Sequence, residues 1–444
     1  MNKLKYLFVF YSLFLFSVAH AKIPDFESFE LDNGLKVVVS ENHKAPIAKV
    51  MLFYKVGAMD EEVGKSGLAH LLEHLMFRGT THVSASSFND LMLQNGIDFN
   101  AFTSKDWTVY HALTDVSRIE LVLALEADRM EHLIIDDEAF QTEQKIVYQE
   151  RQQRIENNPK ARFTEEMNKI LWQDTPYEHP ISGTLEEINT LTKKDALAFY
   201  EAYYTPNNAV LVISGDIKAS QAKMLAEKYF GKIKNKKPFQ KIQKIFSKQD
   251  SGEYVIKKQM YDVKTIQIKM SYIVPSVLDD EKTAYALLLF SSYLGESGHS
   301  YLTKKLIKTQ KALSVRSNVD LFVRGKGEFK LSLLPLAQTD MSKNIKMLED
   351  TMVEALCNLT PEILELEKKK VLSWLVYVKD DPSDMAHLLG IIASLGLDIT
   401  RLEDYVVHIL NVTLSDVQNA VQNMLKTSKK VTAVLMPKNE VSDE

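Results

Sequence analysis

Residues 66–80 read Ser-Gly-Leu-Ala-His-Leu-Leu-Glu-His-Leu-Met-Phe-Arg-Gly-Thr. The leucines and the methionine recur three and four residues apart, which is the spacing of one face of a helix. We therefore expect a buried helix from Gly67 to Phe77, capped at its start by Ser66. Three polar residues interrupt this apolar helix: His70, Glu73 and His74. Burying two imidazoles and a carboxylate costs free energy unless they have partners, and a metal ion is the simplest partner for the set.

His70 and His74 are four residues apart, so a helix places both imidazoles on the same face. Glu73 lies on a neighbouring part of that face. A catalytic zinc site uses three protein ligands and leaves one position open. The spacing therefore predicts His70 and His74 as zinc ligands and Glu73 as a general base that takes a proton from water beside the metal. The alternative is a helix with two structural histidines.

The third ligand must come from elsewhere in the chain, and Glu150 is the best candidate. Glu143 precedes it by seven residues, about two helical turns, so both carboxylates point the same way. Such a helix could give one ligand and one supporting carboxylate. A charged helical surface would show the same pattern, and the spacing leaves both interpretations open.

Length and composition set broad limits. The chain has 444 residues, of which 45% are hydrophobic and 25% charged, as in globular proteins of two or more domains. Its formal net charge of -5 argues against a partner that is a nucleic acid or an anionic membrane surface. The single cysteine, Cys357, excludes an intramolecular disulfide. Its neighbours predict that it packs in the core.

The first 21 residues have the pattern of a secretory signal peptide. Lys3 and Lys5 form a basic start, residues 6–18 form an apolar run, and Ala19-His20-Ala21 fits a cleavage site. The run is short for a membrane span, so we expect cleavage rather than a retained anchor, and no later segment is apolar for long enough to cross a bilayer. The pattern predicts an exported protein.

The remaining chain divides into two halves of mixed structure. In the first half we expect strands at 35–40, 48–56, 99–103, 107–113 and 209–214, and helices at 67–77, 86–94 and over much of 117–170. Residues 233–248 are dense in lysine and read as a linker. The second half repeats the order strand, strand, helix at 254–256, 265–272 and 282–293, before a further helix at 300–309. This predicts an α+β fold of two homologous domains, residues 22–232 and 249–444, each with a mainly antiparallel sheet packed with helices.

The stretch from 66 to 80 resembles the zinc-site segment of the insulinase/pitrilysin metallopeptidases, the inverzincins, whose motif is His-x-x-Glu-His. The likeness is closest to the branch of half-length subunits that includes mitochondrial processing peptidase and similar bacterial proteins. It covers most of residues 27–217 and implies the LuxS/processing-peptidase-like metallohydrolase fold. The other matching segments are Asn95-Gly96, residues 100–106, Ala127-Asp128-Arg129-Met130, Ile181-Ser182-Gly183-Thr184, residues 204–208 and Gly215-Asp216.

The resemblance implies a role for several residues. It maps the distal glutamate ligand onto Glu150, so that one zinc ion per chain is held by His70, His74 and Glu150, and it places Glu143 close to the site as a supporting carboxylate. It also implies that Asn100 and Ala101 bind substrate by backbone pairing at a sheet edge. Otherwise Asn100 is a strand-start residue that satisfies local backbone groups.

The second half departs from the family pattern. Active members carry an arginine and a tyrosine seven residues apart, which hold the substrate and stabilise the tetrahedral intermediate. Lys308 and Val315 stand at the matching positions, and no arginine after residue 246 is followed by such a tyrosine. We therefore expect a heterodimer with a homologous, zinc-free partner that supplies the pair, in preference to a homodimer. The alternative is that another group, such as Tyr301, substitutes.

Together these features predict an exported zinc endopeptidase that acts on peptides or unfolded segments. The family favours the bacterial periplasm as its location. One alternative is a non-catalytic structural or assembly subunit of the same fold, but such members usually lose part of the metal set, which is complete here. A small-molecule metallohydrolase with the same motif is disfavoured by the doubled domain.

Overall fold

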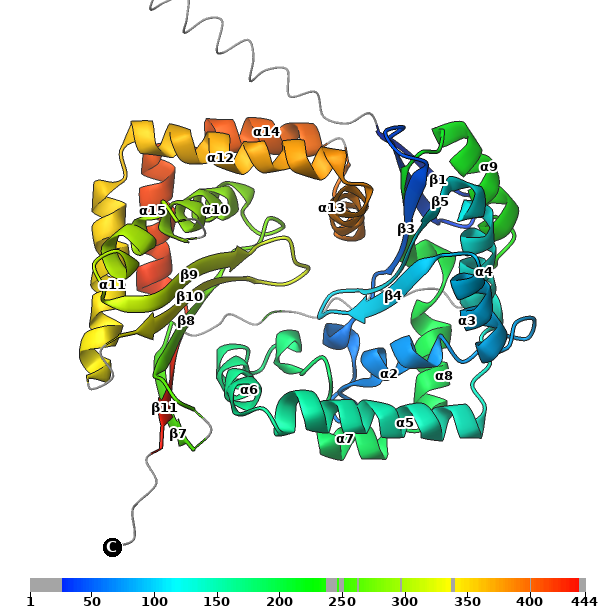
Figure 1. Cartoon of the computed structure of the whole chain (residues 1–444), viewed down its shortest axis with the longest axis horizontal. Helices are drawn as coiled ribbons and strands as arrows, with labels where there is room; N and C mark the ends of the chain where they lie inside the picture. Colours follow the sequence, from blue (N-terminus) through cyan, green and yellow to red (C-terminus); the bar gives the residue numbers. More distant parts are fainter. Residues whose placement is uncertain are drawn as a thin grey trace, which may run out of the picture.

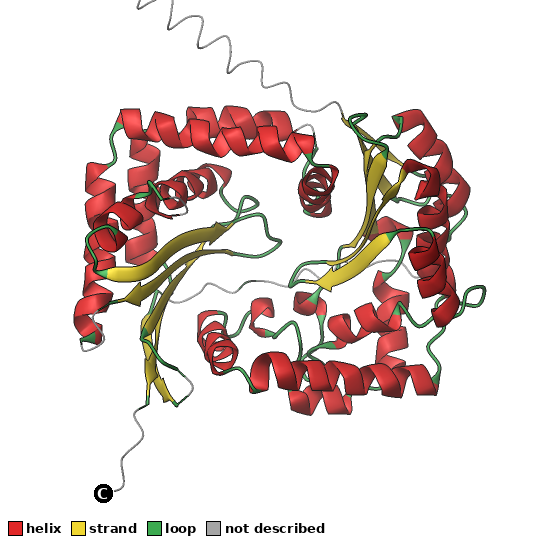
Figure 2. Ribbon diagram, viewed as in Figure 1, coloured by secondary structure: helices red, strands yellow, loops and turns green. Residues whose placement is uncertain are grey.

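The computed structural model describes residues 26–236, 246, 251–261, 263–295, 298–336, 340–399 and 401–438. The expected signal segment and most of the expected linker lie outside these residues. Two halves lie side by side, each with one sheet and a set of helices around it (Figures 1 and 2). Within the described residues, no helix combines the length and the hydropathy that crossing a membrane requires.

The first half contains a six-stranded sheet in the order β1-β2-β6-β3-β5-β4. Only β2 and β6 pair in parallel, and the other neighbours are antiparallel. The expected strands all form, with bounds that differ by a few residues. The strands are β1 (Phe26–Glu30), β2 (Lys36–Glu41), β3 (Ile47–Tyr54), β4 (Asp98–Thr103), β5 (Thr108–Asp115) and β6 (Ala209–Gly215). The helices are α2 (Leu68–Leu75), α3 (Ala85–Gln94), α4 (Ile119–His132), α5 (Asp137–Arg151), α6 (Pro159–Leu171), α7 (Leu185–Thr190), α8 (Lys193–Tyr203) and α9 (Ala219–Phe230).

The second half contains a five-stranded sheet in the order β7-β11-β8-β10-β9, where again one pair, β7 and β11, is parallel. The strands are β7 (Glu253–Met260), β8 (Gln267–Val274), β9 (Ala312–Asp320), β10 (Gly327–Pro335) and β11 (Lys430–Pro437). The helices are α10 (Glu281–Gly295), α11 (Met341–Asn358), α12 (Pro361–Asp380), α13 (Pro382–Ser394), α14 (Arg401–Asn411) and α15 (Leu414–Thr427). Short 3-10 or π segments are η1 (Ala58–Asp60), η2 (Val116–Arg118), η3 (Gln152–Glu156), η4 (Pro176–Glu178), η5 (Pro206–Asn208) and η6 (Thr303–Ile307).

The two sheets have the same topology. When β1 is set aside, the strands of each half, taken in chain order, occupy the same places in their sheet, and the parallel pair is the first strand with the last. The edge strand β4 of the first half therefore corresponds to β9 of the second. This confirms the predicted α+β fold of two similar domains with mainly antiparallel sheets.

One helix of each half packs on the sheet of the other half. Helix α13 of the second half packs on β2, β3 and β6, and α6 of the first half packs on β7, β8 and β11 (Figure 1). Covering both faces of the first sheet explains why β3 is apolar along nearly its whole length, with both Leu52 and Phe53 fully buried. Gly390 allows the close approach of α13, because a Cβ there would lie 2.0 Å from the ring of Phe53.

A second contact between the halves is polar. Arg324, in the turn between β9 and β10, donates hydrogen bonds from its two Nη atoms to the carboxylate of Asp60, at 2.7 and 3.0 Å. The backbone N–H of Arg324 donates to Asp106 Oδ1, which also accepts from the hydroxyl of Tyr177. Asp60, Asp106 and Tyr177 belong to the first half and are buried. These hydrogen bonds fix the β9–β10 turn against the turn that follows β4.

Two local expectations from the sequence were wrong. The cap of α2 is Gly67, and Ser66 instead bonds Glu187 through its hydroxyl. The turn from residue 66 into the helix brings Gly67 against Gly183, where a Cβ would lie 2.9 Å from the Gly183 Cα, so the chain enters α2 with a φ of +88°. Cys357 is exposed because it lies on the outward side of α11. The expected helix at 300–309 forms over residues 301–307, of which Thr303–Ile307 is a π-helix.

Candidate active site

Helix α2 carries the central motif, and a carboxylate fixes its first turn. Glu61 accepts hydrogen bonds from the backbone N–H groups of Gly67 and Ala69, at 3.1 and 2.8 Å. Two of the donors that a helix start leaves unpaired are therefore satisfied by one buried side chain. The apolar face of α2 is buried in the core of the first half. The polar face is thereby held toward α5 and β4.

The three predicted metal ligands lie together. His74 Nε2 lies 3.5 Å from Glu150 Oε2, and His70 Nε2 lies 3.9 Å from Glu150 Oε1. One donor atom from each of the three residues lies within 4.8 Å of the other two. Helix α5 presents Glu150 from its last turn, opposite α2. Donors this close can close around an ion of zinc size after small movements.

Glu143 lies two turns before Glu150 and contacts the far side of His74. His74 Nδ1 and Glu143 Oε2 are 2.8 Å apart, and Arg78 also bonds Glu143. A carboxylate on Nδ1 leaves Nε2 of the imidazole facing the ligand cluster. Glu143 therefore lies where a carboxylate can orient the ring of His74.

Glu73 faces the same space from α2. The hydroxyl of Thr103, the last residue of β4, donates a hydrogen bond of 2.5 Å to Glu73 Oε2. Burial raises the pKa of Glu73, and the bond from Thr103 only partly opposes this effect. A carboxylate with a raised pKa is a better proton acceptor and donor near neutral pH.

The charges of the cluster favour a cation. Burial and the neighbouring His74 lower the pKa of His70 to about 4, so that ring is neutral. Burial would also lower the pKa of His74, but hydrogen bonds with Glu143 and Glu150 outweigh it and raise the pKa to about 9. The carboxylates thus hold a positive charge at His74, and a divalent cation would satisfy the same field.

The donor set fits zinc. Two imidazoles and one carboxylate form a common ligand set of catalytic zinc. The outward nitrogen of His74 is already bonded to a carboxylate, as is usual for metal-bound histidine. His70 Nε2 is the ring nitrogen near Glu150, and the other nitrogen, Nδ1, is buried with no hydrogen-bond partner among the described residues, so this ring has no carboxylate of the kind that orients His74.

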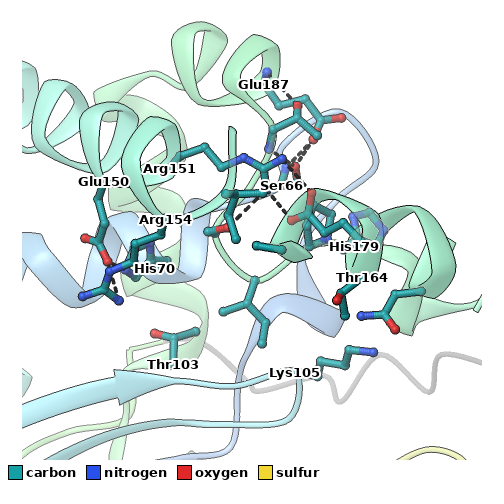
Figure 3. A pocket seen from close by; sticks show the side chains of 18 of the residues that line it. Ser66, His70, Thr103, Lys105, Glu150, Arg151, Arg154, Thr164, His179 and Glu187 are labelled. Carbon is teal, nitrogen blue, oxygen red and sulfur yellow. Dashed lines mark hydrogen bonds and ion pairs between the residues drawn. The ribbon is translucent and has the colours of Figure 1, made fainter. Parts of the chain in front are cut away.

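A cavity of about 1270 Å³ adjoins the cluster. Figure 3 shows Glu150, Arg154 and His70 on one side of it, with Thr103 and Lys105 from the β4 region across the space. Asn100 and Ala101 also line it, on the free edge of the sheet. The backbone N–H of Ala101 is bonded at 2.8 Å to Asn100's own side chain, not to β5, so it points outward from the edge.

Two contacts at this site were not predicted from the sequence. Thr103 could not be linked to Glu73, because the two are 30 residues apart and meet only through the packing of β4 on α2. Arg154 Nη1 lies 2.8 Å from Glu150 Oε1. Its i, i+4 spacing from Glu150 was a signal that could have predicted this pair.

The second half brings none of its candidate groups to the cavity. Val315 is buried in β9 within its own domain, and Lys308 is exposed at the end of η6. Arg324 is bonded to Asp60. Tyr301 accepts a hydrogen bond from Asn358 and is not among the residues that line the cavity.

Two family models match the chain. The model described as "Insulinase (Peptidase family M16)" matches residues 36–185, and that described as "Peptidase M16 inactive domain" matches residues 190–371. The zinc protease PqqE of Helicobacter pylori is 29% identical over 431 residues, which cover 94% of each protein. The probable mitochondrial-processing peptidase subunit beta of Schizosaccharomyces pombe is 28% identical over 215 residues, 48% of this chain and 47% of that protein.

Solved structures agree. The crystal structure of a protease from Helicobacter pylori superposes with a TM-score of 0.86 at 27% identity, covering 94% of this chain and all of that one. The first half of the periplasmic protease PqqL from Escherichia coli has a TM-score of 0.76 at 17% identity, over 93% and 92% of the two chains, which shows the shared fold. With both models matched in order and a full-length relative of the same size, the chain belongs to the insulinase family, peptidase family M16, in its half-length branch.

Proposed function

We propose that this protein is an exported zinc endopeptidase that hydrolyses peptides or unfolded segments. The observation that carries the proposal is the convergence of His70, His74 and Glu150, with Glu73 beside them, at the wall of a large cavity. Relatives named zinc proteases support this activity. In this proposal residues 22–232 form the zinc-binding catalytic domain, 233–248 the linker and 249–444 a homologous domain that lacks the arginine–tyrosine pair.

His70, His74 and Glu150 would hold one zinc ion. Zinc held by two imidazoles and a carboxylate would supply a Lewis acid, which lowers the pKa of water to about 7. Glu73 accepts the proton of the attacking water and then donates it to the leaving amine, which its raised pKa favours. Thr103 fixes the carboxylate of Glu73, and Glu143 fixes the ring of His74.

Asn100 and Ala101 would bind the substrate. The free edge of β4 can accept an extended peptide as an added strand, because the N–H of Ala101 points away from the sheet. A peptide in that position runs past Thr103 and Glu73 toward the metal cluster. Backbone pairing of this kind requires an unfolded substrate.

The proposed location is outside the cytoplasm, in the bacterial periplasm. The support is the signal-like pattern of residues 1–21, cleaved after Ala21. Mass spectrometry of the protein from the host periplasm would give a mature chain starting at Lys22. A chain that keeps residues 1–21 would contradict this.

The test of the catalytic proposal is Glu73→Gln. We expect hydrolysis of an unfolded substrate to fall by about 100-fold or more, while zinc per chain stays the same because Glu73 is not a ligand. His70→Ala should lose both zinc and activity. Retained activity in Glu73→Gln would rule out its role as general base.

A second candidate function is that of a non-catalytic subunit. The observation in its favour is the match of residues 190–371 to a domain described as inactive, together with the missing arginine–tyrosine pair. That match begins at residue 190, after the segment that holds His70, Glu73, His74 and Glu150. If zinc binds but no peptide is cleaved in any assembly, the structural role would be the better explanation.

A further inference from the structure

A second group of metal-binding side chains lies on the surface of the first half. His82, in the loop between α2 and α3, and Asp128 and His132 of α4 each offer a donor atom, and these atoms all lie within 4.8 Å of one another. Among the described residues, this group and the one at His70 are the two that satisfy this criterion. The group shares no residue with the candidate active site.

The loop is already fixed against α4. The Thr80 hydroxyl bonds Asp128 Oδ2 and also accepts from the backbone N–H groups of His82 and Val83, at 3.1 and 2.9 Å. The backbone N–H of Thr81 donates to the carbonyl of His132 at 3.0 Å. Thr80 thus bonds Oδ2 of Asp128 and sets the position of His82. Oδ1 of Asp128 is the oxygen that faces the group.

The side chains face one another. Asp128 Oδ1 lies 2.6 Å from His82 Nδ1, and the rings of His82 and His132 meet edge to face with centroids 4.6 Å apart. Donor atoms around zinc at about 2.0–2.2 Å from the metal lie about 3.3–3.6 Å apart. Small rotations of the two imidazoles would bring the donor atoms to these distances. The side chain of His82 is 60% exposed, so it has room to rotate.

The charges around the group favour a cation. Asp128 and His132 are four residues apart on one helical face, the spacing also seen for His70 and His74. They lie in the last turns of α4, where the helix dipole is negative. Glu131 adds a carboxylate 3.4 Å from His132 Nε2. The nearby Arg129 is buried and bonded to Glu126, so it does not offset this charge.

We propose that His82, Asp128 and His132 form a second transition-metal site, with zinc as the metal that two imidazoles and a carboxylate suit and with water completing the coordination. Its role is to tie the α2–α3 loop to α4. The same loop contains Arg78, which bonds Glu143 behind His74. A metal at His82 would therefore hold the loop that supports the candidate active site.

The test is zinc stoichiometry of the full chain, stripped with a chelator and then dialysed against buffered free Zn²⁺. We expect two zinc ions per chain in the wild type and one in His82→Ala and His132→Ala. His70→Ala should also bind one zinc ion. If His70→Ala does not fold, Glu150→Gln takes its place in the experiment. In the His70→Ala background, Zn²⁺ should raise the melting temperature, and adding His82→Ala should abolish that rise.

His43→Ala is the matched control. His43 is about as exposed as His82 and lies 2.6 Å from Asp216 and 3.1 Å from Glu41, but on opposite ring nitrogens, so the three cannot face one ion. The His43→Ala variant should still bind two zinc ions. The proposal is overturned if His70→Ala binds no zinc, or if His82→Ala and His132→Ala bind as much zinc as the wild type. Zinc bound by His70→Ala reports on this site alone, so failure of the proposed peptidase activity would be seen separately.

Discussion

At the scale of single residues, Glu143 offers a test of how the cluster is supported. It is nearly buried and bonded to both His74 and Arg78. We expect Glu143→Gln to weaken zinc binding at the first site by about 10- to 100-fold, because the glutamine no longer draws charge onto the ring of His74. Competition with a chromophoric chelator measures the affinity.

Glu138→Gln is the control for this substitution, since Glu138 lies on the same helix but is exposed in its first turn. It should bind zinc as the wild type does. An unchanged affinity in Glu143→Gln would mean that His74 is oriented by packing alone.

The residues of the candidate site differ in how far the sequence could predict them. His70, Glu73 and His74 follow from local spacing on one helix, which needs no tertiary information. Glu150 had two open interpretations until the family resemblance was added, because a glutamate on a charged helix looks the same whether or not it faces a metal. Thr103 could not be predicted, since its contact with Glu73 depends on how β4 packs on α2.

At the scale of elements, the free edge of β4 can be tested through one backbone donor. Ala101→Pro removes the N–H that points away from the sheet, and proline is tolerated on an edge strand. Loss of one hydrogen bond should raise KM, or the peptide Kd in a Glu73→Gln background, by about 2- to 10-fold. Fluorescence anisotropy of a labelled unfolded peptide measures the binding.

Ala101→Ser keeps the N–H and is the matched control. Equal binding by the proline and serine variants, with zinc content and circular dichroism unchanged, would mean that substrate does not pair with β4 at this position.

The elements were predicted well where their pattern is local. The β-branched and aromatic runs predicted β2 to β6, and the repeat of strand, strand, helix predicted β7, β8 and α10, whereas β9, β10 and β11 were not predicted. Two features depend on contacts with distant segments and have no local signal. Helices α6 and α13 cross to the opposite sheet. Ser66 bonds Glu187 rather than capping α2, and Glu61 accepts the first N–H groups of that helix.

At the scale of the whole molecule, the polar contact at Arg324 makes the junction of the halves sensitive to pH. Burial raises the pKa of Asp106 to about 6, although Tyr177 and Arg324 oppose the shift. Its unfolded value is about 3.9. The folded state therefore binds the proton more tightly, and the contribution of Asp106 to stability falls as pH rises from about 4 to about 6. Above that range the folded state carries a penalty of about 3 kcal/mol for burying the charge.

Asp106→Asn keeps the acceptor for Tyr177 and Arg324 but removes this titration. We expect the free energy of unfolding of the variant, relative to wild type, to increase between pH 4.5 and 7, measured by urea denaturation. The range stops at pH 7 because burial lowers the pKa of the neighbouring Lys105 to about 8. A difference that stays constant or decreases with pH would contradict the assignment.

The second half lacks the arginine–tyrosine pair, and this bears on how the whole molecule assembles. Val315 is buried and Arg324 is bonded to Asp60, so among the described residues of that half neither can replace the arginine–tyrosine pair at the cavity. We infer that a homologous, zinc-free partner chain supplies the pair. A missing pair of oxyanion donors costs about 100-fold or more in rate. The purified chain alone should therefore bind zinc fully but cleave unfolded substrate at least about 100-fold more slowly than after addition of a partner that has the pair and lacks the His-x-x-Glu-His motif.

The same partner with its arginine and tyrosine replaced should still associate, as seen by analytical ultracentrifugation, but should not restore the rate. Activity of the chain alone, as a monomer or homodimer, that no partner increases would exclude the heterodimer. Arg154, a cation that pairs with Glu150, would then be the next residue to test.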